Sequence, residues 1–338
     1  MKPFSFTRAE TVQDAIAALS VNPDAQVLAG GTNLIDLMKY DVLHPAALVD
    51  INRLPLKDIT ALDDGGIRIG ALASNTAVAY DENVKQRFPL LSSAILAGAS
   101  PQLRNAATTG GNLLQRTRCY YFYDTATPCN KREPGSGCSA IGGVNRIHAI
   151  LGASSACIAV HPSDMCVALR ALDAVVEVEG PEGQREIAFA DFHRLPGDEP
   201  QTDNTLLPGE IITSIKLPGN ALAGNYTYLK IRDRQSYAFA LISVAAAIDI
   251  NNGQVTELRL ALGGVAHKPW RDKVAEAECA GKPADETTFG QFADRLLIGA
   301  RGQGQNDFKI ELARNTIVRA IRQAAAGTPQ DQTVKAIQ

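Results

Sequence analysis

The sequence QVLAGGTNLIDLMKY, from Gln26 to Tyr40, places an apolar strand pattern directly before a glycine turn and a helical pattern. Residues 26–29 are typical of a strand, and residues 34–40 carry the apolar spacing of a helix. Gly30 and Gly31 mark the turn between them. Such a turn presents backbone N–H groups at the positive end of a helix, which suits a pyrophosphate. An ordinary left-handed turn has the same glycines, so a second signal is needed.

A second turn of the same kind supplies that signal. Residues 107–114, ATTGGNLL, repeat the small-residue and glycine pattern of the first turn, and two such turns could grip one diphosphate. Further on, HPSDM precedes an apolar helical stretch, Met165 to Leu172, with Ser163 or Asp164 as the expected N-cap. Asp164 has two possible roles: it caps this helix, or its carboxylate accepts hydrogen bonds from a ribityl or ribose hydroxyl.

Between these motifs lies a glycine-rich segment, residues 116–157, that holds four of the six cysteines. It contains no CxxC pair, so spacing alone indicates a metal centre only weakly. Basic residues outnumber acidic ones here, which fits the negative charge of an iron-sulfur cluster with four thiolate ligands. Glycines let the backbone bend round a compact group and point amides at its sulfurs. Unrelated buried thiols, or disulfides in an oxidising compartment, are the alternatives. The basic residues are Arg116, Arg118, Lys131, Arg132 and Arg146.

Composition limits the class of protein. The chain has 338 residues and a net charge of −3, so we expect two or three domains and no electrostatic attraction to nucleic acid or to an anionic membrane. No apolar run approaches the roughly 20 residues that span a bilayer. The N-terminal sequence MKPFSFTRAETVQ resembles neither a secretory signal nor a twin-arginine signal. We therefore expect the cytoplasm, or export to the periplasm together with a partner.

Taken in order, five segments resemble the flavin subunit of the molybdenum hydroxylases, the xanthine dehydrogenase and carbon monoxide dehydrogenase flavoprotein family. The resemblance covers nearly the whole chain. The inserted loop CYYFYDTATPCNKREPGSGC is similar to one branch, the FAD and 4Fe-4S subunit of bacterial periplasmic aldehyde oxidoreductase, and xanthine dehydrogenase flavin domains lack this insertion. The five segments are AGGTNLIDLMK (29–39), TTGGNLLQ (108–115), PSDM (162–165), PGEIITSIKLP (208–218) and YLKIRDRQSYAFALISVAAA (228–247).

The resemblance implies an α+β fold. A two-lobed FAD-binding domain of the PCMH or vanillyl-alcohol-oxidase type would cover residues 1–217, with the 4Fe-4S insertion at about 116–158. A smaller α+β domain of the CO-dehydrogenase-flavoprotein C-terminal type would cover residues 220–323, and residues 327–338 would form a flexible tail. Within the smaller domain, the Asn-Asn-Gly turn between Ala240–Ile250 and Val255–Leu262 predicts a hairpin, and Phe308 to Ala325 has helical spacing.

The same resemblance implies the site residues. Gln26 to Leu34 would wrap the FAD pyrophosphate, Asp164 would bind the ribityl chain, Ile212 would pack on the isoalloxazine ring, and Lys230 would lie near its pyrimidine side. From the residues alone, Ile212 is a core residue and Lys230 a solvated strand residue. Related subunits often have an acidic residue where this chain has Tyr237 and Ala238. The expected FAD-binding residues are Gln26, Val27, Leu28, Ala29, Gly30, Gly31, Thr32, Asn33, Leu34, Thr108, Gly110, Gly111, Asn112, Asp164, Ile212 and Lys230. The expected cluster ligands are Cys119, Cys129, Cys138 and Cys157, with Cys166 and Cys279 left over.

The function that follows is electron transfer within a molybdenum-dependent aldehyde oxidoreductase. Substrate would be oxidised on a molybdenum-cofactor large subunit, and electrons would pass through a 2Fe-2S small subunit to FAD and then to an external acceptor. No catalytic residue is expected in this chain. The alternatives are the flavin subunit of another molybdenum hydroxylase, a free-standing flavin reductase of the same fold, and a zinc or disulfide protein without flavin.

Overall fold

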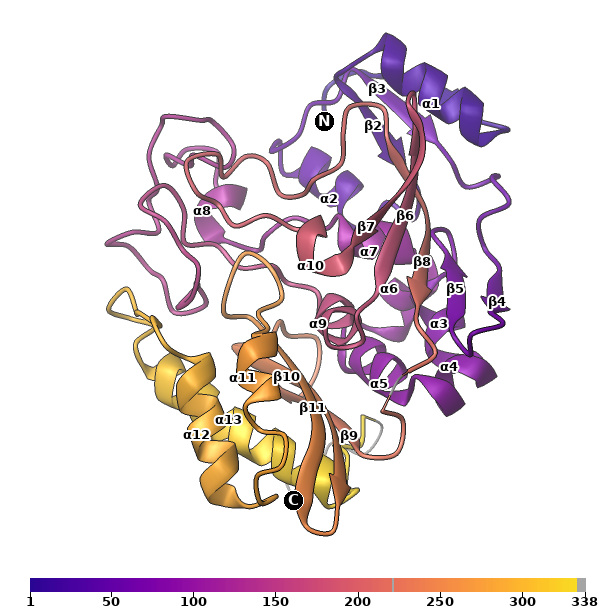
Figure 1. The fold of residues 1–338 in the computed structure, drawn as a ribbon. Helices are drawn as coiled ribbons and strands as arrows, with labels where there is room; N and C mark the ends of the chain where they lie inside the picture. Colours follow the sequence, from indigo (N-terminus) through magenta and orange to yellow (C-terminus); the bar gives the residue numbers. More distant parts are fainter. Residues whose placement is uncertain (221, 333–338) are drawn as a thin grey trace.

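Three β-sheets and the helices that cover them make up the structure, a computed structural model that describes residues 1–220 and 222–332 (Figure 1). The first sheet is parallel, with strand order β1-β3-β2. Its first helix begins with a capping box, because the Thr11 hydroxyl accepts from the Asp14 amide and the Asp14 carboxylate accepts from the Thr11 amide. The elements are β1 (Ser5–Arg8), α1 (Val12–Val21), β2 (Ala25–Leu28), α2 (Leu34–Lys39) and β3 (Ala47–Asp50).

The second sheet is antiparallel, with strand order β4-β5-β8-β6-β7. Along β6 the residues alternate between buried and partly exposed, so Val176 and Val178 enter a core that the helices α3 to α5 and α9 close. The strands are β4 (Ile59–Ala61), β5 (Ile67–Gly70), β6 (Val175–Gly180), β7 (Gly183–Ala188) and β8 (Ile211–Leu217). The helices are α3 (Asn75–Tyr80), α4 (Glu82–Arg87), α5 (Pro89–Ala97), α6 (Pro101–Ala106), α7 (Thr109–Leu113), α9 (Asp164–Ala171) and α10 (Phe189–Phe192).

The cysteine loop runs from the end of α7 to the start of α9 and contains one short helix, α8 (Tyr120–Tyr123). Figure 1 shows it as a set of irregular turns beside the second sheet and above the C-terminal helices. The loop packs round a small apolar core, in which three of the four cysteines lie with Phe122 and Ile158. Leu37 of α2 and Val42 belong to the same core, so the loop is packed against the first part of the chain.

The third sheet lies between two cores. Its order is β11-β10-β9, and Val244, Ala246 and Ile248 of β10 pack with the C-terminal helices while Ala245 and Ala247 join the core of the second sheet. The hairpin that the sequence predicts is confirmed: β10 pairs with β11, and positive φ values at Asn252 and Gly253 form the turn. The elements are β9 (Tyr226–Ile231), β10 (Ile242–Asn251), β11 (Gln254–Gly263), α11 (Lys273–Ala277), α12 (Glu286–Leu296) and α13 (Phe308–Ala325).

The C-terminal segment is described only as far as residue 332. There, the amide of Gln330 donates to the Thr227 hydroxyl, and the side chain of Gln332 donates to the Tyr228 carbonyl. The rest of the expected tail, residues 333–338, lies outside the described residues. Across residues 1–220 and 222–332, no helix has the length and apolar character needed to cross a bilayer.

Candidate functional site

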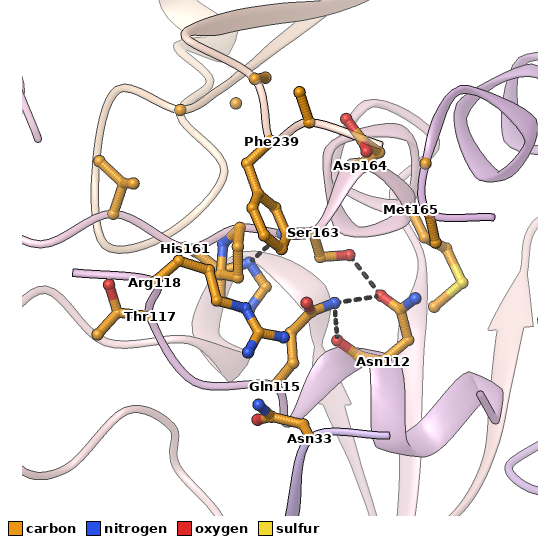
Figure 2. A pocket seen from close by; sticks show the side chains of 18 of the residues that line it. Asn33, Asn112, Gln115, Thr117, Arg118, His161, Ser163, Asp164, Met165 and Phe239 are labelled. Atoms are coloured by element: carbon orange, nitrogen blue, oxygen red, sulfur yellow. Dashed lines mark hydrogen bonds between the residues drawn. The ribbon is translucent and has the colours of Figure 1, made fainter. Parts of the chain in front are cut away.

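A cavity of about 770 Å³ opens where the turns of the first two sheets meet β9 and the segment after it. Its size is within the usual range of small-molecule and cofactor sites. Figure 2 shows Asn33 and Asn112 from the two glycine turns, Asp164 at the start of α9, and Phe239 entering from the segment between β9 and β10. Six of the expected FAD-binding residues line the cavity: Thr32, Asn33, Gly111, Asn112, Asp164 and Lys230.

The first glycine turn offers free backbone donors. Helical hydrogen bonding of α2 begins with the Ile35 amide to the Gly31 carbonyl, and within the described residues the amides of Thr32 and Asn33 have no protein acceptor. Gly31 has a φ of +71°, in the left-handed region that favours glycine. A Cβ on Gly30 would clash with the Ala106 carbonyl, so the two turns approach each other backbone to backbone.

The second glycine turn is held differently. Its amides are used within the protein, since Thr109 donates to the Ala73 carbonyl and Gly110 donates to the Ala71 carbonyl. The Gly111 amide donates to the hydroxyl of Thr108, the N-cap of α7. This turn therefore offers the cavity mainly the surface of Gly111 and the side chain of Asn112, whereas the first turn offers backbone N–H groups.

Asp164 and Lys230 form a buried ion pair in the cavity wall. The Lys230 Nζ lies 2.8 Å from one carboxylate oxygen, and the Tyr228 hydroxyl donates to the other at 2.7 Å. The two side chains are only 3% and 9% exposed, so Lys230 is not a solvated strand residue. The N-cap of α9 is Ser163, whose hydroxyl accepts from the Cys166 amide, so Asp164 is not needed as a cap.

Polar atoms without protein partners point to a ligand in this cavity. The Asn33 Nδ2 and the Asn75 Oδ1 are buried and have no hydrogen-bond partner among the described residues. Buried polar atoms are normally paired, and a nucleotide would supply partners for both a donor and an acceptor. Sequence reasoning missed Asn75. The signal that could have found it is the third small-residue turn, GALASN, between β5 and α3.

Two further residues that line the cavity, Arg118 and Phe239, were not among those expected from the sequence. The Arg118 guanidinium lies over the Phe239 ring, 5.2 Å from its centroid, and both side chains line the cavity. Figure 2 shows both side chains among those that line the cavity. From the sequence, Arg118 was counted among the basic residues of the cysteine segment. Phe239 lies beside Tyr237 and Ala238, the positions where relatives often have an acidic residue, so apolar and aromatic groups border the cavity there.

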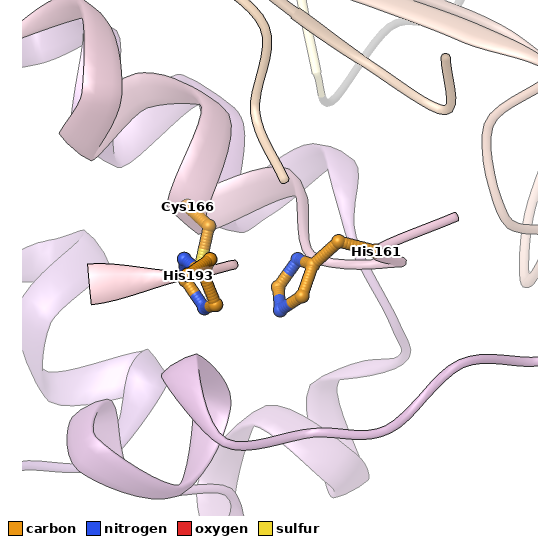
Figure 3. A group of neighbouring side chains, drawn as sticks. All are labelled: His161, Cys166 and His193. Atoms are coloured by element: carbon orange, nitrogen blue, oxygen red, sulfur yellow. The ribbon is translucent and has the colours of Figure 1, made fainter. Parts of the chain in front are cut away.

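His161 lines the cavity, and its ring nitrogen lies within 4.8 Å of the Cys166 sulfur and of a ring nitrogen of His193, both of which are buried (Figure 3). Both imidazoles approach the carbonyl of Leu113 through Nε2, at 3.4 Å and 2.9 Å. Burial lowers the pKa of His193 to about 4 and raises the pKa of Cys166 to about 12, so neither is charged near neutral pH. The arrangement fixes the end of α7 against the segment that leads into α9.

The four expected cluster ligands surround one small cavity beside the larger one. Cys129 and Cys138 face each other across an isolated antiparallel bridge, and the Cys138 and Cys157 thiols are hydrogen-bonded. That bond lowers the pKa of Cys138 to about 6, and burial raises the pKa of Cys119 to about 11. Backbone amides also approach the sulfurs: Tyr121 and Phe122 at Cys119, and Ala140, Ile141 and Ile158 at Cys138. Thiols ringed by amide donors suit a thiolate-bound cluster.

The excess positive charge of the loop is largely compensated by acids from elsewhere in the chain. Asp203 pairs with both Arg116 and Lys131, and Asp233 pairs with Arg146. Basic residues still outnumber acidic ones within the loop, but a count within the loop could not include these acids, which lie some 70 to 90 residues away. Arg132 instead donates to three backbone carbonyls of the loop, those of Tyr121, Phe122 and Thr127.

Ten of the expected FAD-binding residues do not line the cavity. Ile212 is a core residue of β8, paired with Val178 and 5% exposed, which is its position as expected from the residues alone. Its contact with a flavin ring stays a prediction. Cys166 is fully buried in α9, and Cys279 is buried just beyond α11, away from the four-cysteine cavity. Those that do not line the cavity are Gln26, Val27, Leu28, Ala29, Gly30, Gly31, Leu34, Thr108, Gly110 and Ile212.

Comparison with known proteins identifies the class. The family model for the FAD binding domain in molybdopterin dehydrogenase matches residues 2–220, and the model for the CO dehydrogenase flavoprotein C-terminal domain matches residues 227–324. The chain belongs to the family of FAD-binding medium subunits of the molybdenum hydroxylases and is a subunit of an oxidoreductase. The family and the α+β fold expected from the sequence are confirmed.

Three individual proteins show how similar this chain is to known members of the family. The chain is 51% identical over 328 residues to the aldehyde oxidoreductase FAD-binding subunit PaoB of Escherichia coli strain K12, covering 96% of this chain and 99% of that protein. It is 30% identical to the glyceraldehyde dehydrogenase medium chain of Sulfolobus acidocaldarius, over 87% of this chain and 86% of that one. A solved carbon monoxide dehydrogenase of Hydrogenophaga pseudoflava, which lacks the Mo-pyranopterin moiety, has a TM-score of 0.75 at 26% identity, covering 97% of this chain and 99% of its own.

Proposed function

We propose that this chain is the electron-transfer subunit of a molybdenum-dependent aldehyde oxidoreductase and holds FAD and one 4Fe-4S cluster. The observation that carries the proposal is a four-cysteine cavity beside a cofactor-sized cavity, in a chain 51% identical to an aldehyde oxidoreductase FAD-binding subunit. FAD supplies the capacity to accept electrons singly and to release them to an external acceptor. Substrate oxidation belongs to a molybdenum-cofactor large subunit, from which electrons arrive through a 2Fe-2S small subunit.

Different residues of the larger cavity would bind different parts of FAD. The free amides of Thr32 and Asn33 would receive the pyrophosphate, since N–H groups at the start of a helix favour an anion. Asp164 would accept from a ribityl hydroxyl, and the pairing with Lys230 holds its carboxylate in place. Lys230 would in turn carry positive charge toward the flavin, which favours a reduced, anionic ring.

The arrangement of the four cysteines around one cavity supports a single shared centre. Within the described residues no three of the four thiols lie close enough together to hold one ion, which supports a cluster, whose thiolate ligands stand at separate corners. The hydrogen-bonded thiols of Cys138 and Cys157 would have to separate to take two such corners. The amide groups aimed at Cys119 and Cys138 would stabilise the negative charge of such a cluster. None of the six cysteines is in a disulfide, so the four in the loop could bind a cluster once deprotonated to thiolates.

We also propose the division of the chain and its assembly. Residues 1–217 would form the FAD-binding domain, with the cluster loop at 116–158, and residues 220–323 the C-terminal domain; the two family models meet between residues 220 and 227. Relatives are named medium chains, which supports a complex with large and small subunits. The complex would act in the periplasm if a partner carries the export signal, and otherwise in the cytoplasm.

Serine substitution of the cysteines tests the cluster. Cys119→Ser, Cys129→Ser, Cys138→Ser or Cys157→Ser should each diminish or abolish the iron, because a hydroxyl is a poor ligand for it, while Cys166→Ser and Cys279→Ser serve as matched controls that retain it. Iron and sulfide analysis with low-temperature paramagnetic resonance is the measurement, and the wild type should hold about four irons per chain. Zinc in place of iron would refute the cluster. A visible spectrum with flavin bands, from protein that contains neither iron nor zinc, would instead support a flavin reductase or the flavin subunit of another molybdenum hydroxylase.

A further inference from the structure

His148 lies where the cofactor cavity and the four-cysteine cavity meet. It is 1% exposed and lines the larger cavity, and its Nε2 is 3.1 Å from the Sγ of Cys119. Cys119 lines both cavities. The imidazole is therefore in contact with a proposed cluster ligand on the side of the proposed FAD cavity.

Chemistry determines the direction of this hydrogen bond once Cys119 is a ligand. A thiolate carries no proton and can only accept, so the imidazole must donate from Nε2–H. The other ring nitrogen, Nδ1, is buried and has no partner among the described residues. An unpaired buried acceptor costs stability. The bond to Cys119 is thus the polar contact that accounts for the placement of this ring.

The C-terminal part of the chain holds His148 in this position. Its carbonyl accepts from the Lys309 Nζ at 2.8 Å and from the Asn306 Nδ2 at 3.1 Å, and both of those side chains are fully buried. The Asn145 side chain, three residues before His148, bonds to the Gln303 carbonyl and the Gln305 amide. Residues 303–309 therefore grip the backbone on either side of the imidazole.

We propose that His148 raises the reduction potential of the cluster through an N–H···S bond to Cys119, with Lys309 and Asn306 as positioning residues. The inference rests on the proposed cluster. Reduction adds one electron to the cluster and breaks no bond, so the reduced state is more negative than the oxidised one. A donor aimed at a ligand sulfur stabilises the more negative state more strongly and makes reduction easier.

The test compares three variants in the co-expressed complex. His148→Leu removes the donor, His148→Gln restores an N–H of similar reach, and His267→Leu is the matched control, since His267 is buried with no hydrogen-bond partner among the described residues. A redox titration followed by paramagnetic resonance gives the reduced-to-oxidised ratio of the cluster at a fixed potential. For His148→Leu we expect this ratio to fall by up to about tenfold, equivalent to about 59 mV for one electron.

The expected pattern also includes partial recovery in His148→Gln and no change in His267→Leu. A His148→Leu protein with wild-type iron and an unchanged potential would overturn the inference and leave the proposed function standing. Absence of iron from the wild type would instead defeat the proposed function.

A second measurement needs no variant, so it holds even if His148→Leu cannot load iron. In wild-type complex with ¹⁵N-labelled histidine, electron spin echo spectra of the reduced cluster should show one weakly coupled histidine nitrogen, transmitted across the hydrogen bond. Spectra without any such coupling would refute the contact.

Discussion

At the level of single residues, glycine serves two different purposes in the first turn. Gly30 is required by packing, because any side chain there would meet the Ala106 carbonyl of the neighbouring turn. Gly31 is required by conformation, because its φ of +71° costs other residues roughly 1–2 kcal/mol. Only the second requirement bears directly on the free amides of Thr32 and Asn33.

Gly31→Val should therefore empty the FAD site. In addition to the backbone strain, the new Cβ would come within 3.1 Å of the Ile35 side chain. The start of α2 would have to shift, and the amides of Thr32 and Asn33 would no longer point toward the pyrophosphate. Gly253→Val is the matched control: it has a similar φ of +75° with no neighbour near the added carbon, in the hairpin turn away from the cavity. The ratio of flavin to protein absorbance should fall severalfold for the first variant and stay at the wild-type value for the second. Full flavin in Gly31→Val would show that this turn does not hold the pyrophosphate.

At the level of elements, α13 carries an unusual first turn. Lys309 lies there fully buried, near the positive end of the helix dipole, and bonds to the carbonyls of His148 and Gly264. Burial, with a smaller contribution from Arg146, lowers the pKa of Lys309 to about 7, from a usual 10.5. Through Lys309, α13 therefore connects the cluster loop to Gly264, the residue after β11. Burial of the ammonium group disfavours its charged form.

The stability of the protein should consequently depend on pH through Lys309. Because its folded pKa lies below its unfolded pKa, the unfolded chain binds more protons between about pH 7 and about pH 10.5, and this residue's contribution to stability rises with pH across that window. The slope is at most about 1.4 kcal/mol per pH unit. Lys309→Met removes this titrating group. The urea concentration at the midpoint of unfolding, measured from about pH 7 to about pH 9, should therefore rise less in the variant than in the wild type. Parallel profiles would show that Lys309 titrates normally.

At the level of the whole molecule, the third sheet is shared between two of the cores. One face of β10 completes the core of the second sheet, and the segment from Asp233 to Leu241 closes the cofactor cavity. Residues 303–309 hold the cluster loop. The C-terminal part is thus structurally necessary to both proposed cofactor sites.

We expect the chain to be isolated mainly within a complex, because electrons must arrive from centres that it does not carry. Co-expression with the neighbouring subunits and size-exclusion mass measurement should give an assembly with a molybdenum subunit and a 2Fe-2S subunit. Expression of the chain alone is the control and should give a less stable protein. A monodisperse flavoprotein that never associates with a molybdenum subunit would contradict the electron-transfer proposal.

Local sequence was sufficient to predict the elements. The capping box at Thr11, the hairpin at Asn252 and Gly253 and the bounds of α13 were predictable because each depends on dihedral preferences and apolar spacing within a few residues. The two glycine turns were also visible as a repeated pattern. The resemblance to a family then assigned the fold as a whole.

Contacts between distant segments required the tertiary structure. The Asp164–Lys230 ion pair joins residues 66 positions apart, and the acid that neutralises Lys131 is 72 positions away at Asp203. The contact of His148 with Cys119, and its support from Lys309, depend on how the loop packs against the C-terminal helices. A sequence states which groups carry charge or a proton, but packing alone brings them together and removes the water that would otherwise screen them.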